Sequence, residues 1–111
     1  MKIVNRIKAN DDFALTIKKG KVQRNQAYVI HYCTNELNYS RVGISVSSKL
    51  GNAVIRNHIK RQVRSMCDEL IDYNNHNFDI VIVIKQDYLS HSYEDNKMSL
   101  QKLLNFIDRN N

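Results

Sequence analysis

Residues 51–64, which read GNAVIRNHIKRQVR, combine an apolar stripe with a basic face that no acid compensates. Asn52 can cap a helix that begins just after it, and the pattern predicts a helix from there to about Tyr73. At about 100° per residue, five apolar side chains fall within an arc of roughly 80°. They are Ile55, Ile59, Val63, Met66 and Leu70. This stripe predicts that one side of the helix packs on a core.

The other side of the predicted helix is basic. It carries Arg56, Asn57, Lys60, Arg61 and Arg64, and no acid follows until Asp68. Like charges four residues apart destabilise a helix by roughly 0.2–0.5 kcal/mol per pair, so such a face indicates an anionic partner. Arginine forks bind phosphate oxygens bidentately, and asparagine adds a neutral donor and acceptor. Composition and periodicity alone therefore indicate nucleic-acid binding through one helix.

The charge of the whole chain supports this interpretation. The 111 residues carry a net charge of +6. Residues 1–64 hold 13 Lys/Arg and 3 Asp/Glu, a net of +10, whereas residues 65–111 hold 4 and 8, a net of −4. Concentrated positive charge indicates a polyanion-binding surface rather than a generally basic protein. The chain contains no proline, repeat or linker, so residues 1–111 are predicted to form a single RNA-binding domain.

Five further elements are predicted around the basic helix. They are a helix from Asn10 or Asp11 to a stop at Gly20, strands over 27–33, 40–47 and 78–85, and a helix over 94–109. The turn at 35–38 predicts an antiparallel hairpin of the first two strands, and the apolar run 78–85 is typical of a central strand covered on both faces. The order is helix-strand-strand-helix-strand-helix, which predicts a single-domain α/β sandwich with helices on a mixed sheet.

The sequence contains no recognisable catalytic or metal-binding motif. The four histidines have no ligand spacing, no serine or cysteine lies in a nucleophile motif, and no glycine loop could cradle a phosphate. We therefore predict no catalytic residue and no metal ligand in the protein. Cys33 and Cys67 are expected to be free thiols in a reducing compartment. The chain shows no secretory signal and no apolar run long enough to span a bilayer, so a cytoplasmic location without a membrane partner is expected.

Residues 41–64, RVGISVSSKLGNAVIRNHIKRQVR, resemble the signature of the bacterial ribonuclease P protein subunit. The family pattern is a strand ending in V-G-(L/I)-S-V-S, followed by K-x-G-x-A-V-x-R-N-R-x-K-R-x-x-R. The matching residues are Lys49, Gly51, Ala53, Val54, Arg56, Asn57, Lys60, Arg61 and Arg64. Residues 5–20, NRIKANDDFALTIKKG, are similar to the family's opening helix, with Phe13 at its aromatic position.

The resemblance implies both a fold and a function. The basic helix would join two strands by a left-handed crossover, although physics alone favours the right-handed one. A catalytic RNA subunit would use Mg²⁺ to remove the 5′ leader of precursor tRNA, and the protein would contribute no chemistry. The expected contacts to the catalytic RNA are Lys49, Asn52, Arg56, Asn57, Lys60, Arg61 and Arg64. A cleft between the sheet and the first helix would hold the single-stranded leader, through Phe13, Ile17, His31 and Ser47. No DNA partner is expected.

Three residues depart from the family pattern. His58 stands where the family has the second arginine of its R-N-R triplet, Ile17 replaces an aromatic, and His31 replaces a strand aromatic. An aliphatic side chain packs but cannot stack on a base, whereas histidine can stack. The alternatives to this function are a ribosomal or other structured-RNA-binding protein of similar build, and a self-sufficient metal-dependent nuclease. The last would require acids to hold its metal ions, and the acids lie mostly outside the basic half.

Overall fold

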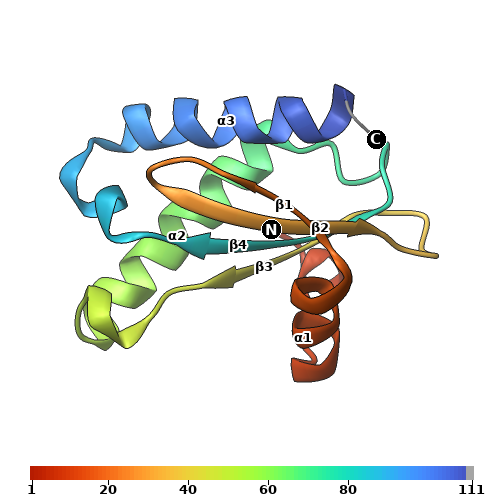
Figure 1. Cartoon of the computed structure of the whole chain (residues 1–111), viewed down its shortest axis with the longest axis horizontal. Coiled ribbons are helices and arrows are strands. Elements are labelled where there is room, and N and C mark those ends of the chain that lie inside the picture. Colours follow the sequence, from red (N-terminus) through yellow and green to blue (C-terminus); the bar gives the residue numbers. More distant parts are fainter. Residues whose placement is uncertain (110–111) are drawn as a thin grey trace.

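The computed structural model describes residues 1–109 and shows a four-stranded sheet with three α-helices (Figure 1). In chain order the elements are η1 (Ile3–Asn5), α1 (Asn10–Lys19), β1 (Lys21–Arg24), β2 (Tyr28–Thr34), β3 (Arg41–Ser45), η2 (Ser48–Leu50), α2 (Ala53–Leu70), β4 (Phe78–Ile84), η3 (Gln86–Ser90) and α3 (Tyr93–Arg109), where η is a 3₁₀ helix. No helix in this part of the chain is long and apolar enough to cross a membrane.

The sheet is mixed, with the strand order β1-β2-β4-β3. β2 pairs antiparallel with β1 and with β4, while β3 pairs parallel with β4. Helices α2 and α3 cover one face of the sheet, and α1 lies against the other (Figure 1). The predicted α/β sandwich is therefore confirmed, and so is a helix that crosses over between two parallel strands, because α2 joins β3 to its neighbour β4.

The predicted antiparallel hairpin of 27–33 and 40–47 is wrong. β4 lies between these two segments: Ile82 is paired with Ile30 of β2 on one side and with Ile44 of β3 on the other. Six of the seven residues of β4 are buried, and only a central position keeps both faces of such a strand out of water. The edge strand β1 was not predicted, because it contains one apolar residue, Val22, and is largely exposed.

Helix α2 begins as expected and ends early. The Asn52 side chain accepts a hydrogen bond from the Ile55 backbone N–H at 3.0 Å, which confirms the predicted cap. The helix ends at Leu70 rather than near Tyr73. Of the predicted stripe, Ile59, Val63 and Met66 are buried together with Cys67, whereas Leu70 is half-buried and Ile55 is exposed. Ile55 lies in the first turn, beyond the region that the sheet covers.

Helix α1 covers part of the sheet face opposite α2. It ends at Gly20 as predicted, but its N-cap is Ala9, without a side-chain hydrogen bond, so the prediction of Asn10 or Asp11 as the cap is wrong. The core lies on the other face. Its side chains come from β2, β4 and the inner sides of α2 and α3, and the α3 contribution of Leu100, Leu103, Leu104 and Ile107 is as predicted. The α1 face therefore lies outside the main core cluster.

Candidate nucleic-acid interface

The basic face of α2 has no acidic counterpart in the described residues. Arg56, Lys60 and Arg64 are half-buried, while Asn57 and Arg61 are exposed. None of their cationic groups takes part in an ion pair within residues 1–109. The Arg56 Nε is buried and lacks a hydrogen-bond partner. These side chains therefore retain N–H groups that can donate hydrogen bonds to an anion.

The loop before α2 holds its shape through local hydrogen bonds. The Ser47 Oγ accepts from the Lys49 backbone N–H at 3.2 Å, and this bond begins η2. Ser47, Lys49 and Asn52 are all exposed. The Asn52 side-chain oxygen accepts the hydrogen bond that caps the helix, so its amide NH₂ is the group left to donate to a partner. The Lys49 ammonium has no acid partner among the described residues.

A groove runs between α2 and the N-terminal segment, and we call it the arginine groove. It is lined by Met1, Arg6, Asn57, Arg61, Arg64 and Asp68. Its one carboxylate is already engaged: Asp68 binds the Met1 ammonium and accepts a hydrogen bond from the Tyr73 hydroxyl at 3.0 Å. The three arginines therefore set the charge that the groove offers to a ligand.

A second groove lies between α1 and the edge strand β3, and we call it the Phe13 groove. It is lined by Arg6, Ile7, Lys8, Phe13, Val42, Gly43, Ile44 and Arg64. The Phe13 ring lies directly on Gly43, where even one extra carbon would collide with it. The groove thus combines an aromatic ring with three cations, the two kinds of group that bind single-stranded nucleic acid. It shares Arg6 and Arg64 with the arginine groove, so the two grooves meet at these side chains.

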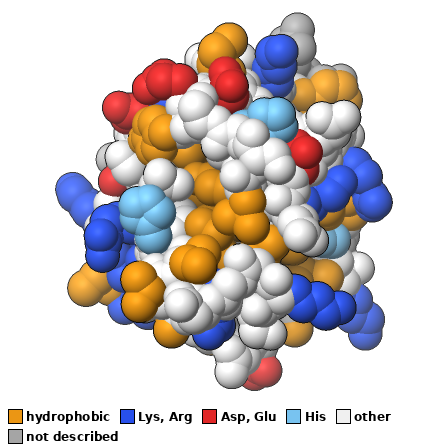
Figure 2. Space-filling model, turned by 90° about the vertical axis from the view of Figure 1, so that its left-hand side faces the viewer, with side chains coloured by type: hydrophobic (Ala, Val, Ile, Leu, Met, Phe, Trp, Pro, Cys, Tyr) orange, Lys and Arg blue, Asp and Glu red, His pale blue; other side chains and the backbone are white. Residues whose placement is uncertain are grey.

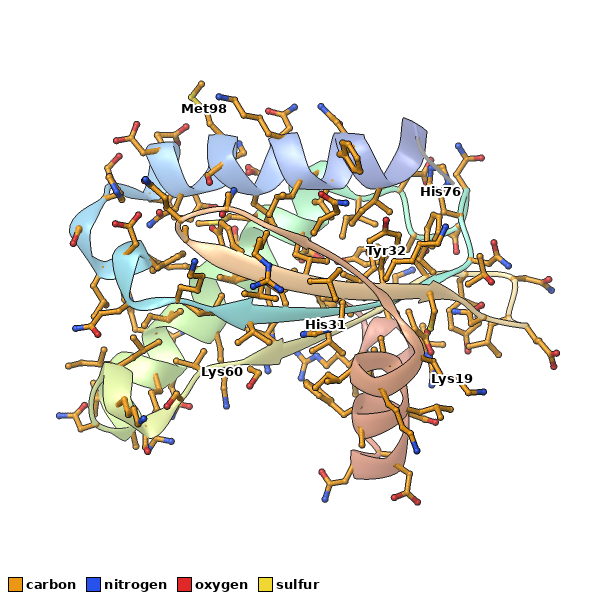
Figure 3. The ribbon with its side chains drawn as sticks, viewed as in Figure 1. Lys19, His31, Tyr32, Lys60, His76 and Met98 are labelled. Atoms are coloured by element: carbon orange, nitrogen blue, oxygen red, sulfur yellow. The ribbon has the colours of Figure 1, made fainter. Side chains whose placement is uncertain are left out.

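The predicted cleft residues occupy different places. His31 pairs across the sheet with Val81, which pairs with Gly43, so the three lie in one row on the α1 face. Burial, followed by the charge of Arg24, lowers the pKa of His31, and its Nδ1 is buried without a partner. In Figure 3, His31 lies on the α1 side of the sheet, and the next residue, Tyr32, lies on the α3 side.

Ile17 and Ser47 do not line the Phe13 groove. Ile17 lies one helical turn after Phe13 on α1, with 43% of its surface exposed. Ser47 follows the end of β3 and begins η2, so the strand is two residues shorter than predicted at this end. The structure therefore brings Phe13 and Gly43 into direct contact and places His31 in the same row of the sheet.

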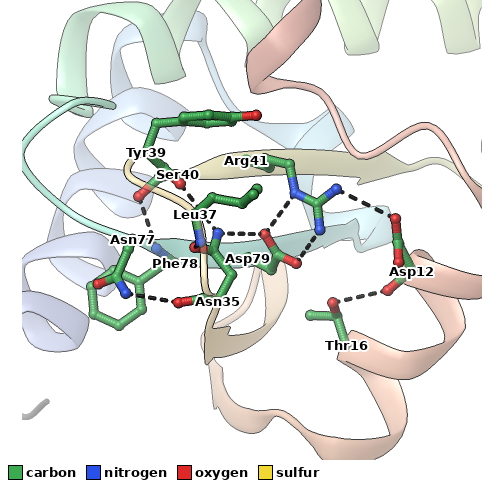
Figure 4. Close-up of polar contacts among 10 residues, drawn as sticks. All are labelled: Asp12, Thr16, Asn35, Leu37, Tyr39, Ser40, Arg41, Asn77, Phe78 and Asp79. Atoms are coloured by element: carbon green, nitrogen blue, oxygen red, sulfur yellow. Dashed lines mark hydrogen bonds and ion pairs between the residues drawn. The ribbon is translucent and has the colours of Figure 1, made fainter.

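An ion-pair network fixes α1 on the sheet (Figure 4). The Arg41 Nε donates to Asp79 Oδ1 at 2.9 Å, and its Nη1 donates to Asp12 Oδ2 at 3.3 Å. Hydrogen bonding to the buried Asp79 raises the pKa of Arg41. The Asn35 amide also donates to Asp79 at 2.8 Å. Arg41, which lies on the face that could meet a ligand, is thus occupied in joining β3, β4 and α1.

Charges of the two signs occupy different regions of the surface. Figure 2 shows exposed apolar side chains in the middle of one face, Lys and Arg along both sides, and most acids toward the end where α3 lies. The exposed apolar residues include Val54 and Ile55 at the start of α2 and Leu89 of η3. Within residues 1–109, no three His, Cys, Asp or Glu side chains form a group that could hold a metal ion.

Sequence reasoning missed Arg6 and Lys8 as groove residues. Both lie in the segment RIK before α1, and they contribute to a groove only because Arg6 forms a bridge with Val42 of β3. The signal in the sequence was the density of cations before Asn10, but nothing local to that segment indicates that it docks beside β3. Gly43 lines the same groove, where the Phe13 ring lies against it.

Comparison with known proteins gives one consistent result. The family model described as Ribonuclease P matches residues 1–108. A Ribonuclease P protein component from Mesoplasma florum is 43% identical over 99 residues, which are 88% of this chain and 90% of the relative. One from Bacillus cereus is 42% identical over 101 residues, 90% of this chain and 88% of the relative. The solved Staphylococcus aureus RNase P protein superposes with a TM-score of 0.83 at 36% identity and covers 93% of this chain and 94% of its own.

Proposed function

The chain belongs to the ribonuclease P protein family, and from this membership we propose which surface of the protein contacts which RNA. It is a protein subunit of ribonuclease P, an endoribonuclease of tRNA processing. One observation carries the proposal. Two grooves, one rich in arginine and one lined by the half-buried Phe13 ring, share Arg6 and Arg64, which form no ion pair with the side chains that the structure describes.

The catalytic RNA docks on the basic face of α2 and on the loop before it. The contacts are Lys49, Asn52, Arg56, Asn57, Lys60, Arg61 and Arg64. Two observations support these contacts. The cations form no ion pair within the described part of the chain, and the Nε of Arg56 is buried without a hydrogen-bond partner. Guanidinium groups satisfy such donors best on phosphate oxygens. Because each neutralised phosphate releases counterions, docking on this face weakens with rising salt.

The 5′ leader of precursor tRNA lies in the Phe13 groove and continues over the sheet past His31. A single strand needs cations for its phosphates and a ring for its bases, and this groove supplies Lys8, Arg6 and Phe13. Ile17 and Ser47 form the margins of the same path. Burial, followed by the charge of Arg24, lowers the pKa of His31, which favours the uncharged ring, and a histidine ring can stack on a base.

The RNA subunit carries out the phosphodiester hydrolysis and holds the Mg²⁺ ions. The distribution of carboxylates supports this assignment, because the acids nearest the grooves are already bound. Asp68 pairs with the Met1 ammonium, and Asp12 and Asp79 pair with Arg41. A metal site needs free carboxylates, so the protein residues at the grooves do not fit Mg²⁺. The two free thiols, Cys33 and Cys67, fit a cytoplasmic site of action.

Reconstitution tests this proposal. Purified protein, a bacterial ribonuclease P RNA and a precursor tRNA are combined at low, near-physiological magnesium, and each component is omitted in turn. We expect cleavage at the 5′ end of the mature tRNA only when protein and RNA are both present. Cleavage by the protein alone would contradict the assignment of the chemistry to the RNA. Binding of the RNA without any effect on cleavage would indicate a structured-RNA-binding protein of another class.

A further inference from the structure

Arg6 and Arg64 are the two side chains that line both grooves. Arg64 lies on α2 and Arg6 in the segment between η1 and α1, so the pair joins two parts of the chain that are distant in sequence. An RNA strand that runs from the Phe13 groove into the arginine groove therefore passes within reach of both. Whatever the pair binds therefore lies on the route between the leader path and the catalytic-RNA face.

The backbone around Arg6 is fixed. The Arg6 N–H donates to the Ile3 carbonyl at 3.1 Å, and the Ile7 N–H donates to the Val42 carbonyl at 3.0 Å. Arg6 also forms a parallel bridge with Val42, which extends the edge of the sheet by one residue pair. A fixed backbone on one side and a helix on the other place the two arginines near each other, so that the charge of Arg6 acts on Arg64.

The pair is electrostatically unsatisfied. Neither arginine has an acid partner among the side chains of residues 1–107, and the one carboxylate of the arginine groove, Asp68, binds the Met1 ammonium. The Arg6 Nε is buried and has no hydrogen-bond partner. Burial and the neighbouring charge of Arg6 lower the pKa of Arg64. An anion placed between the two guanidiniums would offset their mutual repulsion, and it would accept a hydrogen bond from the unpartnered Arg6 Nε–H.

We propose that Arg6 and Arg64 form a phosphate clasp, in which both guanidiniums bind one phosphodiester of the RNA strand that passes from the Phe13 groove into the arginine groove. The clasp rests on the proposed function, because it assumes that a leader occupies the Phe13 groove. It adds Arg6 as a specific binding residue outside the basic helix, and it gives Arg64, whose guanidinium has five N–H donors, a leader phosphate in addition to its contact with the catalytic RNA. The geometry favours a leader phosphate, since Arg6 and Phe13 line the same groove.

Two substitutions of Arg6 test the clasp in the assembled holoenzyme. Arg6→Gln removes the charge and the fork, while Arg6→Lys keeps the charge and loses the fork. Lys102→Ala, on an exposed part of α3, is the matched control for the loss of one positive charge. Dissociation constants are measured for leader-bearing tRNA, for mature tRNA and for the protein with the RNA subunit. A melting curve of each variant shows that it folds.

We expect Arg6→Gln to weaken the binding of leader-bearing tRNA about tenfold and to lower the salt slope by about one unit, with Arg6→Lys in between. Mature tRNA should bind as before, and Lys102→Ala should match the wild type. If Arg6→Gln instead weakens protein–RNA assembly and leaves leader binding intact, the clasped phosphate belongs to the catalytic RNA. Unchanged affinities in both assays would overturn the clasp.

A double-mutant cycle separates the clasp from two independent contacts. If Arg6 and Arg64 hold one phosphate, Arg6→Gln combined with Arg64→Gln loses clearly less affinity than the product of the two single losses. Multiplicative losses would contradict a shared phosphate. Failure of the clasp can be distinguished from failure of the proposed function. The proposed function fails if the wild-type protein does not support cleavage with the RNA, whereas the clasp can fail while wild-type cleavage is normal.

Discussion

The Phe13 ring of α1 lies on Gly43 of β3 so closely that a Cβ at Gly43 would stand 2.7 Å from the ring's Cζ. Gly43 has an ordinary negative φ, so its role here is the absence of a side chain and not backbone freedom. The glycine of the strand motif thus allows the aromatic of the first helix to lie in the groove. One physical contact connects the two parts of the sequence that carry the family resemblance.

The first prediction concerns this contact. Gly43→Ala should push the Phe13 ring out of its place, because the backbone beneath it cannot move and the ring can. We expect leader-bearing tRNA to bind about tenfold more weakly and the protein to lose roughly 1–3 kcal/mol of stability, the usual range for overpacking. The measurements are tRNA affinity of the holoenzyme and urea denaturation of the protein.

Phe13→Ala provides the control for Gly43→Ala. Loss of one stacked base lowers affinity by about 1–3 kcal/mol, and it should affect precursor tRNA and spare mature tRNA. In the Phe13→Ala background, Gly43→Ala should have almost no further effect on leader binding, because the side chain that it displaces is absent. Equal losses for precursor and mature tRNA would instead assign Phe13 to a purely structural role.

The second prediction concerns the salt dependence of docking on the catalytic RNA. Arg61→Ala and Arg64→Ala should each weaken RNA binding and lower the slope of log K against log salt concentration by about one unit. The readout is the dissociation constant of protein and RNA subunit over a series of salt concentrations, with Lys102→Ala alongside. An unchanged slope for Arg61→Ala would mean that its side chain points to solvent in the complex.

The third prediction concerns the ion pairs of Arg41. Asp79→Asn leaves a largely buried guanidinium without its main partner, so we expect a loss of about 2–3 kcal/mol of unfolding free energy. Asp12→Asn removes the other carboxylate, which is 42% exposed, and should cost less than about 1 kcal/mol. Urea denaturation measures both. Similar losses for the two variants would show that Asp79 does not anchor the network.

The fourth prediction concerns alkaline pH. Burial, and then the charge of Asp68, raises the pKa of the Cys67 thiol to about 12. A folded pKa above the unfolded one gives stability that is complete below the unfolded value, about 8.5, and is lost as pH rises toward 12. Between pH 7.5 and 9.5 the wild type should therefore lose about 1 kcal/mol of stability to this group.

Denaturation of Cys67→Ala at both pH values checks the assignment. This variant should show a visibly smaller loss between pH 7.5 and 9.5 than the wild type. Cys33→Ala is the matched control, because Cys33 is only partly buried although burial raises its pKa as well. If Cys67→Ala keeps the full pH dependence, the thiol is not the group that titrates on unfolding.

The local features of the fold could be predicted from the sequence, whereas strand pairing could not. The Asn52 cap and the stripe on α2 depend on residues within one or two turns. The choice of partner for the strand 41–45 depends on β4, almost forty residues later. The near-continuous apolar run of β4 did indicate a central strand, and a central strand needs a neighbour on each side. The predicted hairpin paired 27–33 directly with 40–47 and so left no place for β4 between them.

The candidate site shows the same contrast between local features and contacts between distant segments. The basic face of α2 is visible in the sequence because helical periodicity gathers its residues. The Phe13 groove is not, because Arg6, Phe13 and Gly43 come from three segments that meet only through the sheet topology. Ile17 and Ser47 were predicted from their places in the family motif, and neither of them lines the Phe13 groove.

The most direct test of the account is whether the protein increases affinity for the substrate through the leader. Dissociation constants for tRNAs with leaders of increasing length, and for mature tRNA, are measured with the RNA subunit alone and with the holoenzyme. The account predicts that the protein tightens binding only when a leader is present, and that Phe13→Ala and Arg6→Gln each reduce this gain. An equal gain for mature tRNA would contradict the assignment of the Phe13 groove to the leader path.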